Sequence, residues 1–181
     1  MKTIYRGKTN KGVGIVVRYP VEKDLDQLRC YINILSKEQT YIRFQGEQLT
    51  MREESKYLND QLKKIDKREA VKLLVFNNNK LMAVADINLK DKIESHVGVF
   101  GITVAKEFRN QGIGKLLMNL VFKEAQKKIP SLKIVTLGVF ANNPIAKEMY
   151  KKFGFVEYGK LPKGLVHKNQ FIDHVFMFKK L

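Results

Sequence analysis

The pattern of hydrophobic and polar residues along the 181-residue chain predicts strands and helices in alternation. Apolar, β-branched runs typical of buried strands occur at residues 14–18, 71–76, 80–89, 97–104, 134–140, 155–160 and 171–178. Apolar residues at three- and four-residue spacing predict helices at about residues 24–35, 50–65, 112–129 and 143–153. This order predicts one α/β domain over residues 14–181 with a mixed sheet, after a flexible polar leader at residues 1–13.

Local signals define several of these boundaries. Thr50 and Glu53 have the spacing of a capping box at the start of a helix. Three consecutive asparagines at 77–79 favour a hairpin turn, since asparagine tolerates positive φ. Because a helix connects residues 97–104 to residues 134–140, we expect these two strands to be parallel.

The connection that precedes the longest predicted helix reads RNQGIGK, at residues 109–115. The first turn of a helix carries backbone N–H groups without helical partners, and Gly112 and Gly114 allow those amides to approach an anion closely. The loop lacks the pattern of a Walker A loop and the third glycine of a dinucleotide fingerprint. Taken alone, it predicts either a phosphate-binding turn or a plain connection without a ligand.

A second segment, VFANNPIAKEMYKKFGF at residues 139–155, lies about thirty residues further on. Together the two segments resemble the GNAT superfamily of acyl-CoA-dependent N-acetyltransferases. The first has its R-x-x-G-x-G pattern, and the second matches at Val139, Asn143, Ala146, Met149, Tyr150, Lys152, Gly154 and Phe155. Asn143 and Gly154 also have structural explanations, as a helix N-cap and a left-handed helix stop. The resemblance covers roughly 160 residues, and it implies an α/β (α+β) fold. In that fold a mixed, mostly antiparallel sheet of about seven strands has splayed central parallel strands and about four flanking helices.

The resemblance further implies acetyl-CoA as acyl donor and no metal. The residues expected to contact the cofactor are Ile102, Thr103, Val104, Arg109, Asn110, Gln111, Gly112, Ile113, Gly114, Lys115, Asn143, Ala146, Tyr150 and Lys152. An amine would attack the thioester directly and form a tetrahedral intermediate. The oxyanion of that intermediate would accept a hydrogen bond from a backbone N–H near Val104. Tyr150 would then protonate the leaving thiolate or stabilise it by hydrogen bonding.

The general base is less clearly indicated, because Val99 and Phe100 stand where many relatives carry a glutamate. His96 is the first candidate, since its ordinary pKa suits the task. Glu38 is the second and Asp173 the third. A base matters more for a lysine or polyamine acceptor than for an α-amine, whose pKa is lower.

The acceptor is expected over the edge of the cleft formed by residues 36–44 and by a basic loop at residues 162–170. It would be the amine of a small molecule or of a protein, and its identity stays open among protein lysines or N-termini, polyamines, amino acids and antibiotics. A catalytically silent acyl-CoA-binding sensor is the alternative function. The protein is expected to be a monomer or a homodimer.

Composition narrows the choice of partners and compartment. The net charge is +16, with 34 Lys and Arg against 18 Asp and Glu. The lysines are scattered, which favours attraction of a polyanionic cofactor over specific nucleic-acid binding and weighs against a polycationic acceptor. No apolar run is long enough to cross a membrane, so we expect a cytoplasmic protein. The single cysteine, Cys30, excludes an internal disulfide and a cysteine metal cluster, and its apolar neighbours predict that it is buried.

Overall fold

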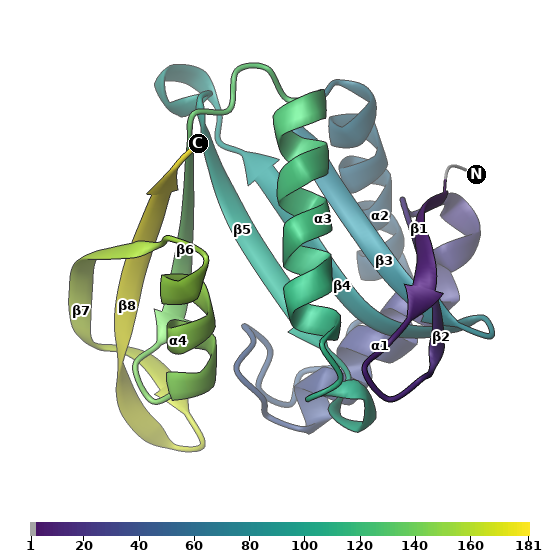
Figure 1. The fold of residues 1–181 in the computed structure, drawn as a ribbon. Coiled ribbons are helices and arrows are strands. Elements are labelled where there is room, and N and C mark those ends of the chain that lie inside the picture. Colours follow the sequence, from purple (N-terminus) through teal and green to yellow (C-terminus); the bar gives the residue numbers. More distant parts are fainter. Residues whose placement is uncertain (1–2) are drawn as a thin grey trace.

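Residues 3–181, which a computed structural model describes, form one mixed sheet covered by helices on both faces. The strand order is β1-β2-β3-β4-β5-β6-β8-β7. Figure 1 shows α3 and α4 on one face of the sheet, and α1 and α2 on the other. The strands are β1 (Thr3–Lys8), β2 (Gly14–Arg18), β3 (Ala70–Asn77), β4 (Lys80–Leu89), β5 (Val97–Val104), β6 (Ile134–Phe140), β7 (Val156–His167) and β8 (Gln170–Lys180). The α-helices are α1 (Leu25–Lys37), α2 (Met51–Asp66), α3 (Ile113–Lys128) and α4 (Pro144–Lys152).

Apolar packing on the two faces accounts for the position of the helices. Helix α3 buries Leu117, Met118 and Val121 against one face. On the other face, Leu28 of α1 and Leu58 of α2 pack in a second cluster with strand residues of β3 and β4. Because α1 directs Leu28, Tyr31 and Leu35 toward the sheet, Cys30 lies on its outer side and is exposed. The prediction that Cys30 is buried was therefore wrong.

Several local predictions are confirmed. Thr50 accepts a hydrogen bond from the Glu53 backbone, while the Glu53 carboxylate accepts one from the Thr50 N–H, so the capping box is formed. Asn78 and Asn79 have positive φ values of 42° and 66° in the turn between β3 and β4. Gly154 ends α4 with φ of 85°.

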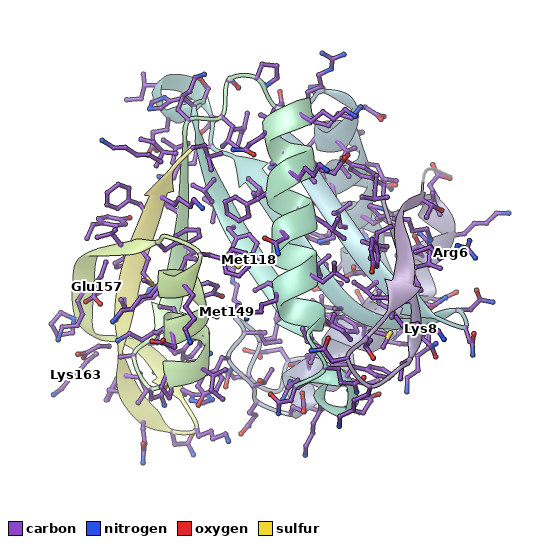
Figure 2. The ribbon with its side chains drawn as sticks, in the orientation of Figure 1. Arg6, Lys8, Met118, Met149, Glu157 and Lys163 are labelled. Carbon is purple, nitrogen blue, oxygen red and sulfur yellow. The ribbon has the colours of Figure 1, made fainter. Side chains whose placement is uncertain are left out.

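The leader at residues 1–13 was predicted to be flexible, but Thr3–Lys8 forms strand β1, paired antiparallel with β2. Ile4 and Tyr5 pack against the main core, which ties the segment down. The sheet therefore has eight strands rather than about seven. The two edge strands carry charged side chains, among them Arg6 on β1 and Lys163 on β7 (Figure 2), which discourage pairing with another sheet edge.

The basic loop predicted at residues 162–170 is also different. Strand β7 continues to His167, and the turn to β8 consists of Lys168 and Asn169, both with positive φ. Pro162 is tolerated because β7 is an edge strand and its register with β8 shifts between Leu161 and Leu165.

The two central strands, β5 and β6, are parallel as predicted but pair over a short length. Their register runs only from Val97 opposite Ile134 to Val99 opposite Thr136. Beyond that point β5 continues along β4 to Val104, whereas β6 continues along β8 to Phe140. The strands therefore part in the middle of the sheet, as the resemblance implied.

No helix among residues 3–181 has both the length and the apolar character needed to cross a membrane.

Candidate functional site

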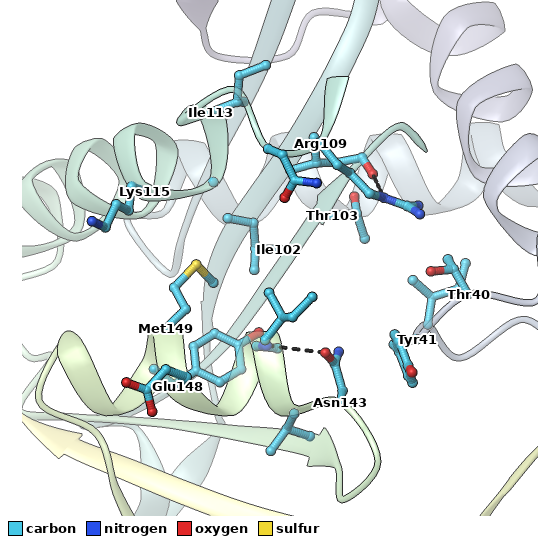
Figure 3. Close-up of a pocket in the computed structure, with 18 of the residues that line it drawn as sticks. Thr40, Tyr41, Ile102, Thr103, Arg109, Ile113, Lys115, Asn143, Glu148 and Met149 are labelled. Carbon is cyan, nitrogen blue, oxygen red and sulfur yellow. Dashed lines mark hydrogen bonds between the residues drawn. The ribbon is translucent and has the colours of Figure 1, made fainter. Parts of the chain in front are cut away.

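A cavity of about 730 Å³ opens where β5 and β6 part. Its wall combines the end of β5, the glycine loop and first turn of α3, the end of β6, helix α4 and the connector between α1 and α2. Figure 3 shows Arg109 and Thr103 on the β5 side, Asn143 and Glu148 on the α4 side, and Tyr41 of the connector beyond them. The volume lies within the range of small-molecule and cofactor sites.

The cavity brings together nearly all the residues predicted to contact a cofactor. Those that line it are Ile102, Thr103, Val104, Arg109, Asn110, Gly112, Ile113, Gly114, Lys115, Asn143, Ala146, Tyr150 and Lys152. Gln111 is the exception, because its buried side chain points away from the cavity and donates to the Glu107 carbonyl at 3.0 Å. Gln111 therefore stabilises the loop from the side opposite the cavity.

The glycine loop presents unpaired amides to this cavity. Asn110 and Gly112 are left-handed, with φ of 59° and 79°, and the first bond of α3 runs from the Leu116 N–H to the Gly112 carbonyl at 3.1 Å. The preceding amides of Ile113 to Lys115 thus have no partner within the helix. Both the amides and the positive end of the helix dipole suit an anionic group.

The turn between β1 and β2 holds the glycine loop in place. The Asn10 N–H donates to the Gln111 carbonyl at 3.1 Å, and the Thr9 hydroxyl donates to the Gln111 side-chain oxygen at 3.3 Å. A Cβ on Gly112 would lie only 2.8 Å from Nδ2 of the Asn10 side chain. The loop conformation favours glycine at 112 chiefly because its φ is positive, and a larger residue would also displace the Asn10 side chain.

Arg109 links the loop to the end of β5 and to the connector. Its Nε donates to the Val104 carbonyl at 3.0 Å, and its Nη2 donates to the Glu38 carboxylate at 2.8 Å. Glu38, the second candidate base, is therefore engaged by a guanidinium. Its position indicates a role in orienting Arg109.

Tyr150 is buried in α4 and lines the cavity. Its ring packs against Phe100 and Phe155, with centroids 6.1 and 5.9 Å away. Burial raises the pKa of the phenol to about 12, so it is protonated at neutral pH. Asn143 lies beside the same cavity, where its side chain caps α4 by accepting from the Ala146 N–H at 3.2 Å.

The other two candidate bases lie elsewhere. His96 is exposed at the start of β5, roughly 25 Å by strand rise from Val104 at its other end. The glycine loop follows the opposite end of β5, where the cavity opens, so this position does not support the hypothesis that His96 is the base. Asp173 accepts from the Lys163 N–H at 2.9 Å and pairs with Lys160 at 3.3 Å. These contacts hold the pKa of its carboxyl below the ordinary value, which weakens it as a base.

Sequence reasoning missed a contact that fixes the connector, which we call the aromatic clamp: Tyr41, Phe140 and His167. Tyr41 contacts both other rings, with centroids 5.6 Å from Phe140 and 4.8 Å from His167. The Tyr41 hydroxyl donates to the Asn142 carbonyl at 3.1 Å. Because the Gln39 carbonyl lies 2.9 Å from His167 Nε2, that nitrogen is the donor, and Nδ1 faces the Asn142 amide at 3.4 Å. No local pattern marks His167, since its partners are distant in the sequence.

Metal coordination has no visible basis in the described part of the chain, where no group of three or more His, Cys, Asp or Glu side chains is arranged to hold an ion.

Comparison with known proteins gives a consistent result. The model of the acetyltransferase (GNAT) family matches residues 32–155. An L-amino acid N-acetyltransferase, AaaT of Escherichia coli strain K12, is 30% identical over 83 residues, which are 46% of this chain and 51% of that protein. The match thus spans about half the length of this curated relative.

Solved structures extend the similarity over nearly the whole chain. A GNAT-family acetyltransferase from Streptococcus pneumoniae is 28% identical, with a TM-score of 0.83, and the alignment covers 92% of this chain and 99% of that one. YncA from Salmonella typhimurium, solved with its cofactor acetyl-CoA, is 14% identical with a TM-score of 0.79, covering 92% and 94% of the two chains. The second similarity concerns the fold alone.

Proposed function

This chain belongs to the acetyltransferase (GNAT) family, and we propose that it transfers the acetyl group of acetyl-CoA to the primary amine of a small molecule or protein. The observation that carries this proposal is the cavity between the parted strands. It joins a helix N-terminus with free amides to a buried, protonated tyrosine.

The chemistry of the cavity fits the donor. Lys115 adds positive charge near the amides of α3, where the diphosphate would bind, while Arg109 and Lys152 lie close by in ion pairs with Glu38 and Glu148. Past Val99 and Thr136, the facing edges of β5 and β6 do not pair with each other. Their N–H and C=O groups are available to the amide-bearing arm of the cofactor, in the manner of an added strand.

The pKa of Tyr150 favours one of the two roles considered for it. A thiol has a pKa of about 8.5, whereas that of the phenol is about 12. Full proton transfer from Tyr150 to the leaving thiolate would therefore be uphill by about 5 kcal/mol. We propose that Tyr150 donates a hydrogen bond to the developing thiolate and that the proton on the product thiol comes from the amine or solvent.

The acceptor we favour is an α-amine. At pH 7, deprotonating an α-amine costs about 1 kcal/mol, while a lysine side chain costs about 5 kcal/mol. The carboxylate on the cavity wall, Glu148, pairs with Lys152 at 3.2 Å and is poorly placed to remove so tightly held a proton. The similarity to an L-amino acid N-acetyltransferase points to the same class.

The test is thiol release from acetyl-CoA with a matched panel of acceptors. Free amino acids and peptides with unblocked N-termini form one arm, and Nα-acetyl-lysine and spermidine form the other. We expect turnover in the first arm, with the N-acetylated product identified by mass spectrometry. Saturable acetyl-CoA binding without thiol release in any arm would instead favour the silent sensor, for which the absence of a carboxylate at Val99 and Phe100 is the supporting feature.

A further inference from the structure

One histidine near the cavity has no role in the scheme above. His174 lies on β8 directly opposite Phe140 of β6. Because side chains alternate along a strand, His174 shares a face with Phe140 and Gly138, while Val139 and Val175 point into the main core on the other side. The face of His174 is that of the aromatic clamp, where the acceptor is expected.

The His174 ring occupies the space that a side chain at 138 would need. Its Nε2 lies inside the volume of a Cβ built on Gly138, and the neighbouring ring carbons lie 2.9 and 3.2 Å from that position. Gly138 is exposed and lines the cavity. A glycine in the middle of a strand commonly marks a place where another group approaches closely, and here that group is an imidazole packed against a residue that lines the cavity.

Tyr150 and His174 reach the parted strands from opposite faces. Tyr150 belongs to the core cluster that contains Val139 and Val175, on the side covered by α4. His174 stands on the other side, where Phe176 stacks on its ring with a centroid separation of 4.3 Å. An acyl transfer in which the thiolate leaves on one side and the amine arrives from the other needs one group on each side.

The imidazole of His174 is also available to accept a proton. Among residues 3–181 it has no hydrogen-bonded partner, whereas both nitrogens of His167 are engaged. The groups packed around it are apolar: Phe140 on β6, Leu161 and Gly164 on β7, and Phe176 on β8. The nearest charged residue along β8, Asp173, points to the other face and is held by Lys160 and Lys163. Partial burial lowers the pKa of His174, so the ring is neutral at pH 7.

We propose that His174 is the general base that accepts the proton of the attacking amine, an inference that rests on the proposed acetyl transfer. One proton passes from the ammonium form of the acceptor to Nε2 and then to solvent. The amine nitrogen forms a bond to the thioester carbon, its second proton is lost as the C–S bond breaks, and one proton ends on the sulfur. The products are an amide with one N–H, free thiol and one released proton.

The experiment compares His174→Gln with His96→Gln, a matched histidine at the far end of β5. Initial rates are measured from pH 5.5 to 9 with two acceptors whose amines differ in pKa. Wild type should show an acidic limb that is the same for both acceptors. In His174→Gln the shared limb should give way to one that follows the pKa of each amine, because only the neutral amine then reacts. The loss in kcat/KM should therefore grow as the pH falls and reach at least about tenfold at pH 6. His96→Gln should behave as wild type.

Two further measurements keep the result interpretable. The dissociation constant of acetyl-CoA, measured by calorimetry, should be unchanged in His174→Gln, which shows that the site is intact; His174→Asn serves if the glutamine variant is unstable. Histidine NMR should give wild-type His174 a titration midpoint below 6.5 that coincides with the acidic limb. Retention of the shared limb, or a loss of rate below threefold at pH 6, overturns the role of His174. An inactive wild type instead rejects the proposed function together with this role.

Discussion

Replacing Tyr150 by Phe tests how the leaving thiolate is stabilised. The ring contacts with Phe100 and Phe155, at 6.1 and 5.9 Å between centroids, remain in the variant, so its thermal midpoint should stay within a few degrees of wild type. Only the hydroxyl on the cavity wall is lost.

The expected loss follows from the chemistry of that hydroxyl. A hydrogen bond to a charged partner contributes about 1.5–3 kcal/mol, which corresponds to a fall in kcat of roughly 10- to 150-fold. Since burial raises the pKa of Tyr150 to about 12, the phenol keeps its proton throughout an assay between pH 6 and 10. Wild type and variant should therefore have alkaline limbs of the same shape, and the KM for acetyl-CoA should change little.

The assay is thiol release at saturating acetyl-CoA and acceptor, with circular dichroism as a check on folding. Two results would refute the reasoning. A loss above a thousandfold, together with an alkaline limb below pH 10 that disappears in the variant, would mean that Tyr150 does transfer its proton. A variant as active as wild type would mean that the hydroxyl does not contact the reacting sulfur.

The remaining predictions concern the two loops that border the cavity. Gly112→Ala places a Cβ at φ of 79° and 2.8 Å from the Asn10 amide; a torsional cost of about 1–2 kcal/mol should raise the KM for acetyl-CoA about 5- to 30-fold. Gly114→Ala is the control for the strain itself, since its Cβ would lie 3.8 Å from the nearest atom, the Met149 sulfur; only Gly112→Ala should lower the thermal midpoint, and equal shifts would contradict the strain argument. Tyr41→Phe removes one hydrogen bond from the aromatic clamp and should raise the acceptor KM about 2- to 10-fold, with the acetyl-CoA KM unchanged. His167→Ala, which also frees the Gln39 carbonyl, should raise the acceptor KM further, and a change confined to the acetyl-CoA KM would show that the connector has no part in acceptor binding.

Features that depend on neighbouring residues were predictable from the sequence. The capping box at Thr50, the asparagine turn after β3 and the glycine loop before α3 each arise from side chains or φ preferences within a few positions. The parallel pairing of β5 and β6 followed from the helix between them. The residues expected to contact the cofactor lie in two short segments, and almost all of them line the cavity.

Features that depend on which strands are neighbours were decided only by the tertiary structure. Strand β1 was predicted to be a flexible leader because its short pattern is polar, yet pairing with β2 satisfies its backbone and brings Asn10 beneath Gly112. His96 attracted attention by its place at the start of a central strand, but the glycine loop follows the opposite end of that strand, and the cavity opens there. His174 was overlooked because its approach to Gly138 results from the pairing of β8 with β6, two strands well separated along the chain. Hydrophobic periodicity and helix caps reflect interactions between residues close in the sequence. Strand order and register decide which distant side chains meet on one face of the sheet, and no local pattern in a single sequence specifies them.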